Sequence, residues 1–335
     1  MHPASARIAS VGIHLPERTR STRDTERDLR ARNPGLKLAT GLVGRMTGVE
    51  RVHVRGEGWQ TSDLAVAAAR EALADAPGEV DLLIFASASQ DLIEPSTSHI
   101  VAAKLGLTCP VMDVKNACNS VLNAMQVAEA LIASGQYRRV LIASGEEPSH
   151  AVRWDLADHD QFIRSFPGYT MSDGGAAVVL EATDDSGTGI LDSSFIAVSR
   201  HWEVGTLPTG GSMNPRSLDH AYFDMDGHAL QEAFLELGPQ PVLDLLDRNG
   251  WTWQDFDLVA IHQVALPYLP PIFDRLGVPG DKTVVTIADH GNLASVTLPL
   301  QLSLARERGL VREGSLALLI GLAGGISLGL MAVRL

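Results

Sequence analysis

Cysteine is scarce in this sequence, which has only Cys109 and Cys118 among its 335 residues. Two cysteines do not make the disulfide framework that stabilises many small secreted proteins, so we expect a reducing setting. Residues 1–7 also lack a basic segment followed by a long apolar run, so no signal peptide is expected. Together these absences favour a cytoplasmic globular protein.

Clusters of basic residues are absent as well. The chain has 27 Lys and Arg against 40 Asp and Glu, giving a formal net charge of −13. Nucleic-acid binding is not expected, because it needs a concentrated basic surface. One uncharged run, residues 316–333, has the length of a membrane span, but its four glycines indicate two buried strands joined by a turn. We therefore expect no membrane association.

Apolar strand patterns alternate with amphipathic helical patterns, which is typical of α/β proteins. The first part of the chain predicts helices from residue 61 and over residues 120–134, and strands over residues 8–15, 82–86, 111–114, 140–143 and 176–180. A similar order recurs later, with a strand at 257–262, a corner at 284–292, a helix at 294–307 and a strand at 317–320. This weak repeat indicates a duplicated unit. The polar stretch 182–187 divides the chain into halves 1–183 and 184–335.

Cys118 lies where a predicted strand meets a predicted helix, a corner at which proteins expose nucleophiles. The N-terminus of a helix favours the reactive thiolate, although a cysteine taken alone is more often a structural core residue. If the halves are duplicates, Asn292 occupies the equivalent corner and His262 ends a central strand, so the three side chains meet. Backbone amides at Cys118 and in the turn at Gly324 are then candidates for an oxyanion hole.

The residues of several segments resemble the thiolase-fold condensing enzymes, and most closely the β-ketoacyl-acyl-carrier-protein synthase III family. The resemblance runs nearly from end to end. The matching segments are residues 47–51, 113–118, 172–176, 262–263, 290–292 and 323–329.

The resemblance implies a duplicated, five-layered αβαβα thiolase fold and a homodimer. It implies that Cys118 takes an acyl group from an acyl-CoA or acyl-carrier-protein thioester. His262 and Asn292 would then bind a malonyl thioester and stabilise the enolate left by loss of carbon dioxide. The amides of Cys118 and Gly324 would form the oxyanion hole for the attack on acyl-Cys118. No metal or other cofactor is expected.

This sequence departs from the family pattern at four positions near the expected donor site. Where the family usually has Asn, Arg, Trp and Arg, the chain has Ala265, Pro267, Leu42 and Met46. These departures leave a second interpretation open. In it the acyl group passes to a hydroxyl or another carrier, and His262 acts as general base. A silent partner subunit is a third reading, disfavoured because Cys118 is kept.

Two further expectations concern the surroundings of the site. Residues 190–239 are predicted to form a lid and part of the acyl pocket, because loops carry specificity more often than cores do. Arg45, Arg51 and Arg153 are candidates for docking an acidic carrier protein, although solvated surface arginines are the default reading.

Overall fold

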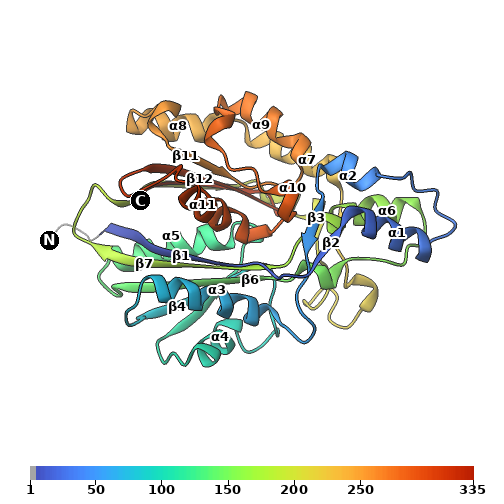
Figure 1. Ribbon diagram of the computed structural model, residues 1–335, viewed down its shortest axis with the longest axis horizontal. Helices are drawn as coiled ribbons and strands as arrows, with labels where there is room; N and C mark the ends of the chain where they lie inside the picture. The colour runs from blue at the N-terminus through green and yellow to red at the C-terminus, as the bar shows by residue number, and fades with distance from the viewer. Residues whose placement is uncertain (1–4) are drawn as a thin grey trace.

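Two β-sheets organise the computed structural model, which describes residues 5–335 (Figure 1). The first sheet has the order β1-β7-β6-β4-β5. In it β4 runs parallel to β5 and β6, whereas β7 is antiparallel to β6 and β1. Its strands are β1 (Ser5–His14), β4 (Leu82–Ala86), β5 (Val111–Val114), β6 (Arg139–Glu146) and β7 (Gly174–Thr183).

The second sheet has the order β11-β12-β13-β8, with β11 parallel to β12 and the other pairs antiparallel. Its strands are β8 (Gly189–Ala197), β11 (Leu258–Ile261), β12 (Leu316–Ala323) and β13 (Ser327–Arg334). Two short ribbons lie outside the sheets. They pair β2 (Thr19–Ser21) with β3 (Arg51–His53), and β9 (Gly205–Thr206) with β10 (Asp224–Met225).

Helices cover both outer faces and fill the space between the sheets (Figure 1). The first sheet is covered outside by α3 (Thr61–Asp75) and α4 (Thr97–Leu105), and the second by α8 (Gln240–Asn249) and α9 (Leu269–Leu276). Between the sheets lie α5 (Ser120–Ala133) and α11 (Thr297–Glu307). The other helices are α1 (Thr22–Arg32), α2 (Leu42–Thr47), α6 (His159–Ser165), α7 (Gly227–Leu237) and α10 (Ile287–His290). This arrangement confirms the predicted five-layered αβαβα fold.

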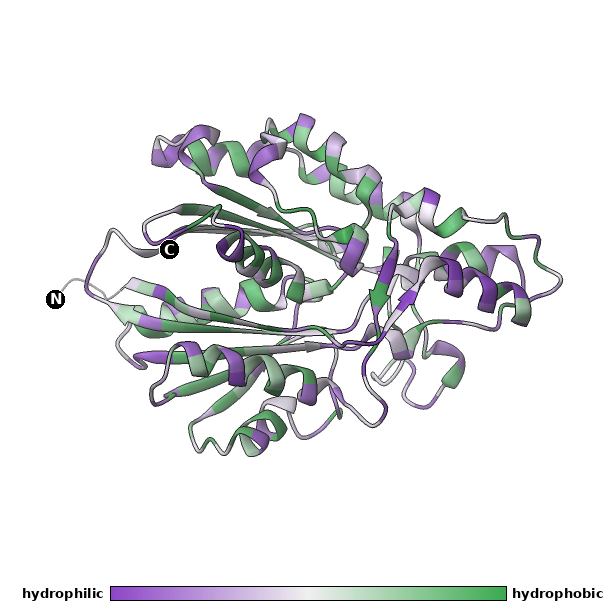
Figure 2. Ribbon diagram, in the orientation of Figure 1, coloured by the Kyte–Doolittle hydropathy of each residue, from purple (hydrophilic) through white to green (hydrophobic). Residues whose placement is uncertain are grey.

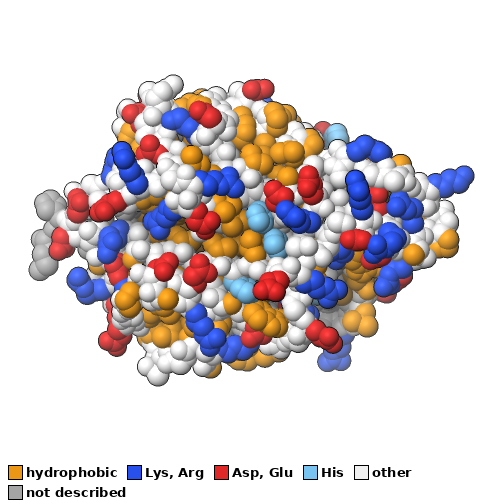
Figure 3. All heavy atoms as spheres, viewed as in Figure 1, with side chains coloured by type: hydrophobic (Ala, Val, Ile, Leu, Met, Phe, Trp, Pro, Cys, Tyr) orange, Lys and Arg blue, Asp and Glu red, His pale blue; other side chains and the backbone are white. Residues whose placement is uncertain are grey.

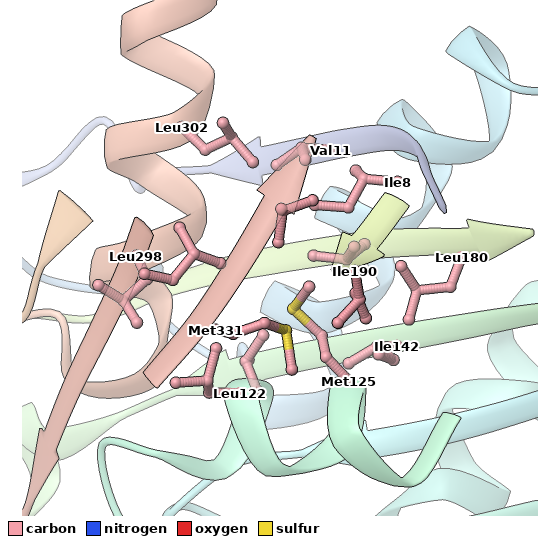
Figure 4. Close-up of a cluster of buried hydrophobic side chains, with 14 of the residues drawn as sticks. Ile8, Val11, Leu122, Met125, Ile142, Leu180, Ile190, Leu298, Leu302 and Met331 are labelled. Carbon is pink, nitrogen blue, oxygen red and sulfur yellow. The ribbon is translucent and has the colours of Figure 1, made fainter. Parts of the chain in front are cut away.

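The largest apolar cluster occupies the central layer, where side chains from both sheets meet those of α5 and α11 (Figure 4). Met125 of α5 and Met331 of β13 lie in the middle of it, and Ile8 of β1 packs from the first sheet. Burying each such side chain stabilises the fold by about 1.5–3 kcal/mol. The outer helices turn hydrophilic residues to solvent (Figure 2). The core therefore fixes the two central helices, and with them the segments that precede each helix.

Glycines let α3 press against the first sheet. A Cβ atom on Gly145 would lie 2.0 Å from the carbonyl oxygen of Thr61, and one on Gly175 would lie 2.1 Å from that of Leu64. Real side chains do not tolerate such distances, so only glycine fits at either position. Gly175 of the motif at residues 172–176 is therefore explained by the packing of α3 against β7.

The predicted strands over 82–86 and 111–114 coincide with β4 and β5, and the apolar run 316–333 forms β12 and β13 as predicted. No helix within residues 5–335 is long and apolar enough to cross a membrane. The first sheet is built from strands within residues 5–183 and the second from strands within 189–334. The division into halves at residue 183 stays a prediction that these boundaries support.

One predicted correspondence is incomplete, because the segment before Asn292 forms no strand. The side chain of Gln263 replaces the missing strand pairing: its Oε1 accepts hydrogen bonds from the amides of Thr286 and Ile287 at 2.9 and 3.1 Å. Its Nε2 donates to the carbonyl of Val284 at 2.8 Å. A single buried amide therefore holds this segment where the first half uses β5.

Candidate active site

Cys118 lies in a tight corner between β5 and α5. The preceding residue, Ala117, has a φ of 45°, a left-handed conformation that costs a non-glycine residue about 1–2 kcal/mol. The hydroxyl of Ser120 holds the corner, accepting from the amide of Asn116 at 2.9 Å and donating to the carbonyl of Ala117 at 2.7 Å. Strain of this kind persists only where surrounding contacts impose it, and it is common at functional sites.

The thiol of Cys118 is not ionised in the resting protein. Burial raises its pKa to about 12, and the nearby carboxylate of Glu146 acts in the same direction. The expectation that the start of α5 favours a thiolate is therefore wrong, because burial and a neighbouring acidic group outweigh the helix terminus. Cys118 enters the reaction as a thiol that still has to lose its proton.

His262 follows the last residue of β11 and is almost completely buried, with 3% of its surface exposed. Its amide donates to the carbonyl of Ile320 at 2.9 Å, which extends the pairing of β11 with β12. Neither ring nitrogen has a hydrogen-bond partner among the described residues. Burial lowers the pKa of His262 to about 4. The ring is therefore neutral near pH 7, with one N–H and one lone pair available to a bound molecule.

Asn292 is fixed through its backbone. Its amide donates to the carbonyl of Thr170 at 2.8 Å, and its carbonyl accepts from the amide of Ser172 at 2.9 Å. Its side-chain Oδ1 accepts from the amide of Ala294 at 3.0 Å. With Oδ1 occupied, the Nδ2 group is the part of the side chain that remains available as a donor. The motif at residues 172–176 thus also anchors Asn292.

Gly324 begins the turn that joins β12 to β13. Gly325 and Ile326, which complete the turn, have φ values of 83° and 54°. Within residues 5–335, neither the amide of Gly324 nor that of Cys118 donates to a backbone carbonyl. Two amides free to donate are what an oxyanion hole requires. The carbonyl of Gly205 lies 3.8 Å from the position of a Cβ on Gly324, so β9 borders this turn.

Contacts between neighbouring residues connect the segments that carry these groups. Cys118 and Ser295 line one small cavity of about 10 Å³, and Ser295 is three residues beyond Asn292. Strand β12 connects His262 to the Cys118 segment. The amide of His262 donates to the carbonyl of Ile320 in β12. The next residue of β12, Gly321, lies against Asn119, which follows Cys118. In the described part of the chain, Cys118, His262 and Asn292 make no hydrogen bond to one another.

Sequence reasoning missed a buried acidic group beside the cysteine. Glu146, at the end of β6, is 1% exposed, and burial raises the pKa of its carboxyl group. It accepts from the hydroxyl of Ser295 at 2.5 Å and from the amide of Ala88 at 3.0 Å. Ser295 also lies 2.9 Å from the hydroxyl of Ser144. An acidic residue ending an otherwise apolar strand was the available signal.

The backbone angles correct the expectation that Asn292 occupies the position equivalent to Cys118. Ala117 precedes the first residue of α5 by three positions, and Ala294, with a φ of 48°, precedes the first residue of α11 by the same number. Cys118 and Ser295, which follow these two alanines, therefore occupy equivalent positions in the two halves. Asn292 belongs to the same loop, three residues earlier.

The four departures from the family pattern lie on two neighbouring elements. Leu42 and Met46 belong to α2, and Ala265 and Pro267 lie at or beside the short turn that packs on it. The contact is close, since a Cβ on Gly48 would lie 2.5 Å from the Cβ of Leu266. The four positions of the expected donor-recognition surface therefore lie on elements that are in contact.

The three candidate docking arginines are each engaged within the chain. Arg45 donates to the carbonyl of Thr40, Arg51 pairs with Asp289 at 2.7 Å, and Arg153 donates to the carbonyl of Asp219. Acidic and basic side chains are interspersed over the face shown in Figure 3. Carrier-protein docking at these arginines remains a prediction. Residues 5–335 contain no group of three or more His, Cys, Asp and Glu side chains that could hold a metal ion.

Two family descriptions and curated relatives match this chain. A family described as 3-oxoacyl-[acyl-carrier-protein (ACP)] synthase III matches residues 112–199, and the family describing its C terminal part matches residues 246–335. The β-ketoacyl-[acyl-carrier-protein] synthase III of Rhodobacter capsulatus is 32% identical over 335 residues, with 98% of each chain covered. That of Neisseria gonorrhoeae strain FA 1090 is 30% identical, with 98% of this chain and 99% of the relative covered.

Solved structures show the same fold. The 3-oxoacyl-(acyl carrier protein) synthase III, FabH, of Pseudomonas aeruginosa is 27% identical, with a TM-score of 0.85 and 98% of each chain covered. A serine-for-cysteine variant of Xanthomonas campestris OleA, solved with lauric acid and lauroyl-CoA, is 24% identical, with a TM-score of 0.88 and 99% of each chain covered.

The fold and the family matches together define an acyl-transferring enzyme of the thiolase superfamily. Within that superfamily, the chain belongs to the β-ketoacyl-acyl-carrier-protein synthase III family of condensing enzymes.

Proposed function

We propose that the enzyme loads an acyl group from acyl-CoA onto Cys118 and then condenses it with a malonyl-acyl-carrier-protein thioester. The observation that carries this proposal is the state of His262. Its ring is buried, neutral and without a partner at the end of a central strand. A buried group left unpaired costs about 1–3 kcal/mol, which a bound substrate would recover.

In the loading step, the sulfur of Cys118 bonds to the thioester carbonyl carbon, and the bond from that carbon to the sulfur of CoA breaks. The proton of the Cys118 thiol ends on the departing CoA sulfur, so the step is balanced. While the sulfur adds to the carbonyl carbon, the carbonyl oxygen carries negative charge. The free amides of Cys118 and Gly324 are the donors that we assign to that oxygen.

In the second step, the malonyl thioester loses carbon dioxide and becomes an enolate. The N–H of the neutral His262 ring and the Nδ2 group of Asn292 donate to its oxygen. The enolate carbon attacks the acyl carbon, and the bond to the sulfur of Cys118 breaks. A neutral imidazole suits this role, because donors placed where charge develops act most strongly in a dry site.

Assembly and location also belong to this proposal. β5 is the last strand of the first sheet, so one of its edges is open within a single chain. Open edges are usually covered, and a second copy of the chain pairing there fits the expected homodimer. The two unpaired cysteines support a cytoplasmic, reducing setting. The folding units would be the halves 1–183 and 184–335.

A second function keeps the loading step but passes the acyl group to a hydroxyl or another carrier. The observation that favours it is the joint replacement on α2 and the adjoining turn, where Leu42, Met46, Ala265 and Pro267 stand. In that reaction His262 would remove a proton from the alcohol. No carbon dioxide would be released.

The test is intact-protein mass spectrometry after incubation with a panel of acyl-CoA thioesters. We expect the wild type to gain the mass of one acyl group and Cys118→Ala to gain none. Acyl-enzyme is then mixed with malonyl-acyl-carrier protein or with candidate alcohols. Release of carbon dioxide supports condensation, whereas an ester product without carbon dioxide supports the second function.

The variant His262→Ala separates the two half-reactions. If His262 serves the enolate, this variant acylates at the wild-type rate and fails only when the malonyl thioester is added. Slow loading in the same variant would show instead that His262 takes the proton of Cys118, and would overturn the assigned role.

A further inference from the structure

Two asparagines on either side of the Ala117–Cys118 corner bind the same serine in the second half. The Nδ2 group of Asn119 donates to the hydroxyl of Ser327 at 3.0 Å and to its carbonyl at 3.3 Å. The Nδ2 group of Asn116 donates to that hydroxyl at 3.3 Å. These bonds join residues more than 200 positions apart in the sequence. They connect the loop of Cys118 directly to the strand that follows the Gly324 turn.

Space for Asn119 is provided by a glycine of β12. A Cβ atom on Gly321 would lie 2.0 Å from Oδ1 of Asn119, a distance that would force the asparagine out of place. Gly321 has an ordinary backbone conformation, since its φ is not among the positive values in the chain. The glycine is therefore explained by the room it leaves for the side chain of Asn119.

The buried side chain of Asn119 lowers the stability of the fold. Its side chain is fully buried, and Oδ1 has no hydrogen-bond partner within residues 5–335. A buried acceptor without a partner costs about 1–3 kcal/mol, and an alanine would avoid that cost. Unpaired buried groups of this kind call for an explanation other than stability.

We propose that Asn119 is a positioning residue that sets the spacing between the two amides of the oxyanion hole. One amide belongs to Cys118, the neighbour of Asn119, and the other to Gly324, three residues before Ser327. The two donors come from different halves, and the bonds from Asn119 to Ser327 directly join the two segments that carry them. This inference rests on the proposed acylation of Cys118.

The expected size of the effect follows from the geometry. Removing one oxyanion donor outright slows catalysis by about 100- to 1,000-fold. Loss of the bridge displaces the donors without removing them, so we expect acylation to slow by about 10- to 100-fold. Alkylation of Cys118 by iodoacetamide forms no oxyanion, so its rate should not change.

The experiment compares these two reactions in Asn119→Ala and Ser327→Ala. Acylation is followed as a single turnover at saturating acyl-CoA by intact mass, and alkylation at one fixed pH with iodoacetamide. Both variants should acylate slowly and alkylate within twofold of the wild type. Ser327→Ala removes the hydroxyl acceptor but leaves the bond from Asn119 to the carbonyl of residue 327, so it should slow acylation less than Asn119→Ala. The double variant should slow acylation by less than the product of the two single effects, because both substitutions weaken the same bridge.

A matched control is Asn33→Ala, which removes another buried asparagine far along the chain from the corner. Asn33 donates to the carbonyls of Leu29 and Trp154 and accepts from the amide of Leu156. It should lower the melting temperature and leave the acylation rate constant unchanged. The inference is overturned if Asn119→Ala acylates normally, or if its acylation and alkylation fall together. Absence of acylation in the wild type would contradict the proposed function itself.

Discussion

The Cys118 and Ser295 corners share a left-handed alanine and have different surroundings. Each residue follows an alanine with positive φ and stands two positions before one of the central helices. The hydroxyl of Ser295 is tied to Glu146 and Ser144, whereas the structure gives the sulfur of Cys118 no side-chain partner in residues 5–335. Duplication has therefore supplied one geometry twice, and hydrogen bonding has left only one of the two side chains free to react.

The halves also contribute different parts of the proposed chemistry. The first half supplies the nucleophile and one oxyanion amide. The second supplies the other amide, the imidazole of His262 and the carboxamide of Asn292. The proposed site is therefore complete only when both halves are joined, and the bonds from Asn119 to Ser327 are one direct link between them.

The largest expected effect distinguishes the two corners directly. Cys118→Ala should abolish the acyl-enzyme, whereas Ser295→Ala should retain it, because the serine proton is committed to Glu146. The measurement is intact mass after exposure to acyl-CoA. Acylation of Cys118→Ala at Ser295 would show that the two corners are chemically equivalent.

The next effect concerns the buried imidazole of the second half. Above about pH 6.5, His262 is neutral in both the folded and the unfolded chain. Between about pH 6.5 and pH 4, His262 binds a proton in the unfolded chain but stays neutral in the folded protein. The free energy of unfolding therefore falls as the pH falls. The total loss attributable to His262 is about 3 kcal/mol.

Urea unfolding between about pH 7 and pH 4 measures this contribution. In His262→Leu the dependence on pH should be shallower by about 1.4 kcal/mol per pH unit in that window. His228→Leu, which replaces a histidine whose side chain is 81% exposed, is the control and should keep the wild-type slope. An unchanged slope in His262→Leu would show that the ring is not held neutral by burial.

A smaller effect tests the influence of Glu146 on the thiol. Removing its charge in Glu146→Gln should lower the pKa of Cys118 and raise the rate of iodoacetamide alkylation near pH 8, by about tenfold. The control Glu147→Gln changes the adjacent carboxylate, which pairs with Arg55 instead. It should leave the rate unchanged. A slower reaction in Glu146→Gln, in protein with a normal melting temperature, would contradict the assigned direction.

The smallest expected effect tests whether the backbone strain at Ala117 and at Ala294 is similar. Ala117→Gly and Ala294→Gly should each change the free energy of unfolding by less than about 1 kcal/mol, in the stabilising direction, because glycine adopts positive φ freely. Ala124→Gly within α5 should destabilise by about 1 kcal/mol or more. Opposite signs at the two corners would show that their backbones are not equivalent.

Local pattern predicted the elements of the fold, and long-range contacts supplied the rest. β4 and β5 could be predicted to the residue because each is a short segment placed between clear turn and helix signals. The absence of a strand before Asn292 depends on Gln263, whose partners lie more than 20 residues away. No local pattern signals such a pairing.

The candidate site divides in the same way. Motifs and strand ends mark Cys118, His262 and Asn292 in the sequence, and their catalytic roles stay a prediction. The bridge from Asn119 to Ser327 spans 208 positions, and the link from Ser295 to Glu146 spans 149. The shift from Asn292 to Ser295 as the partner of Cys118 required the backbone angle of Ala294. Folding brings these groups together, so only the structure could show them.

The most direct test is a crystal structure of the enzyme after reaction with acyl-CoA. We expect an acyl group bonded to the sulfur of Cys118, with its carbonyl oxygen about 3 Å from the amide nitrogens of both Cys118 and Gly324. An acyl group on another residue, or a carbonyl oxygen directed away from those two amides, would contradict it.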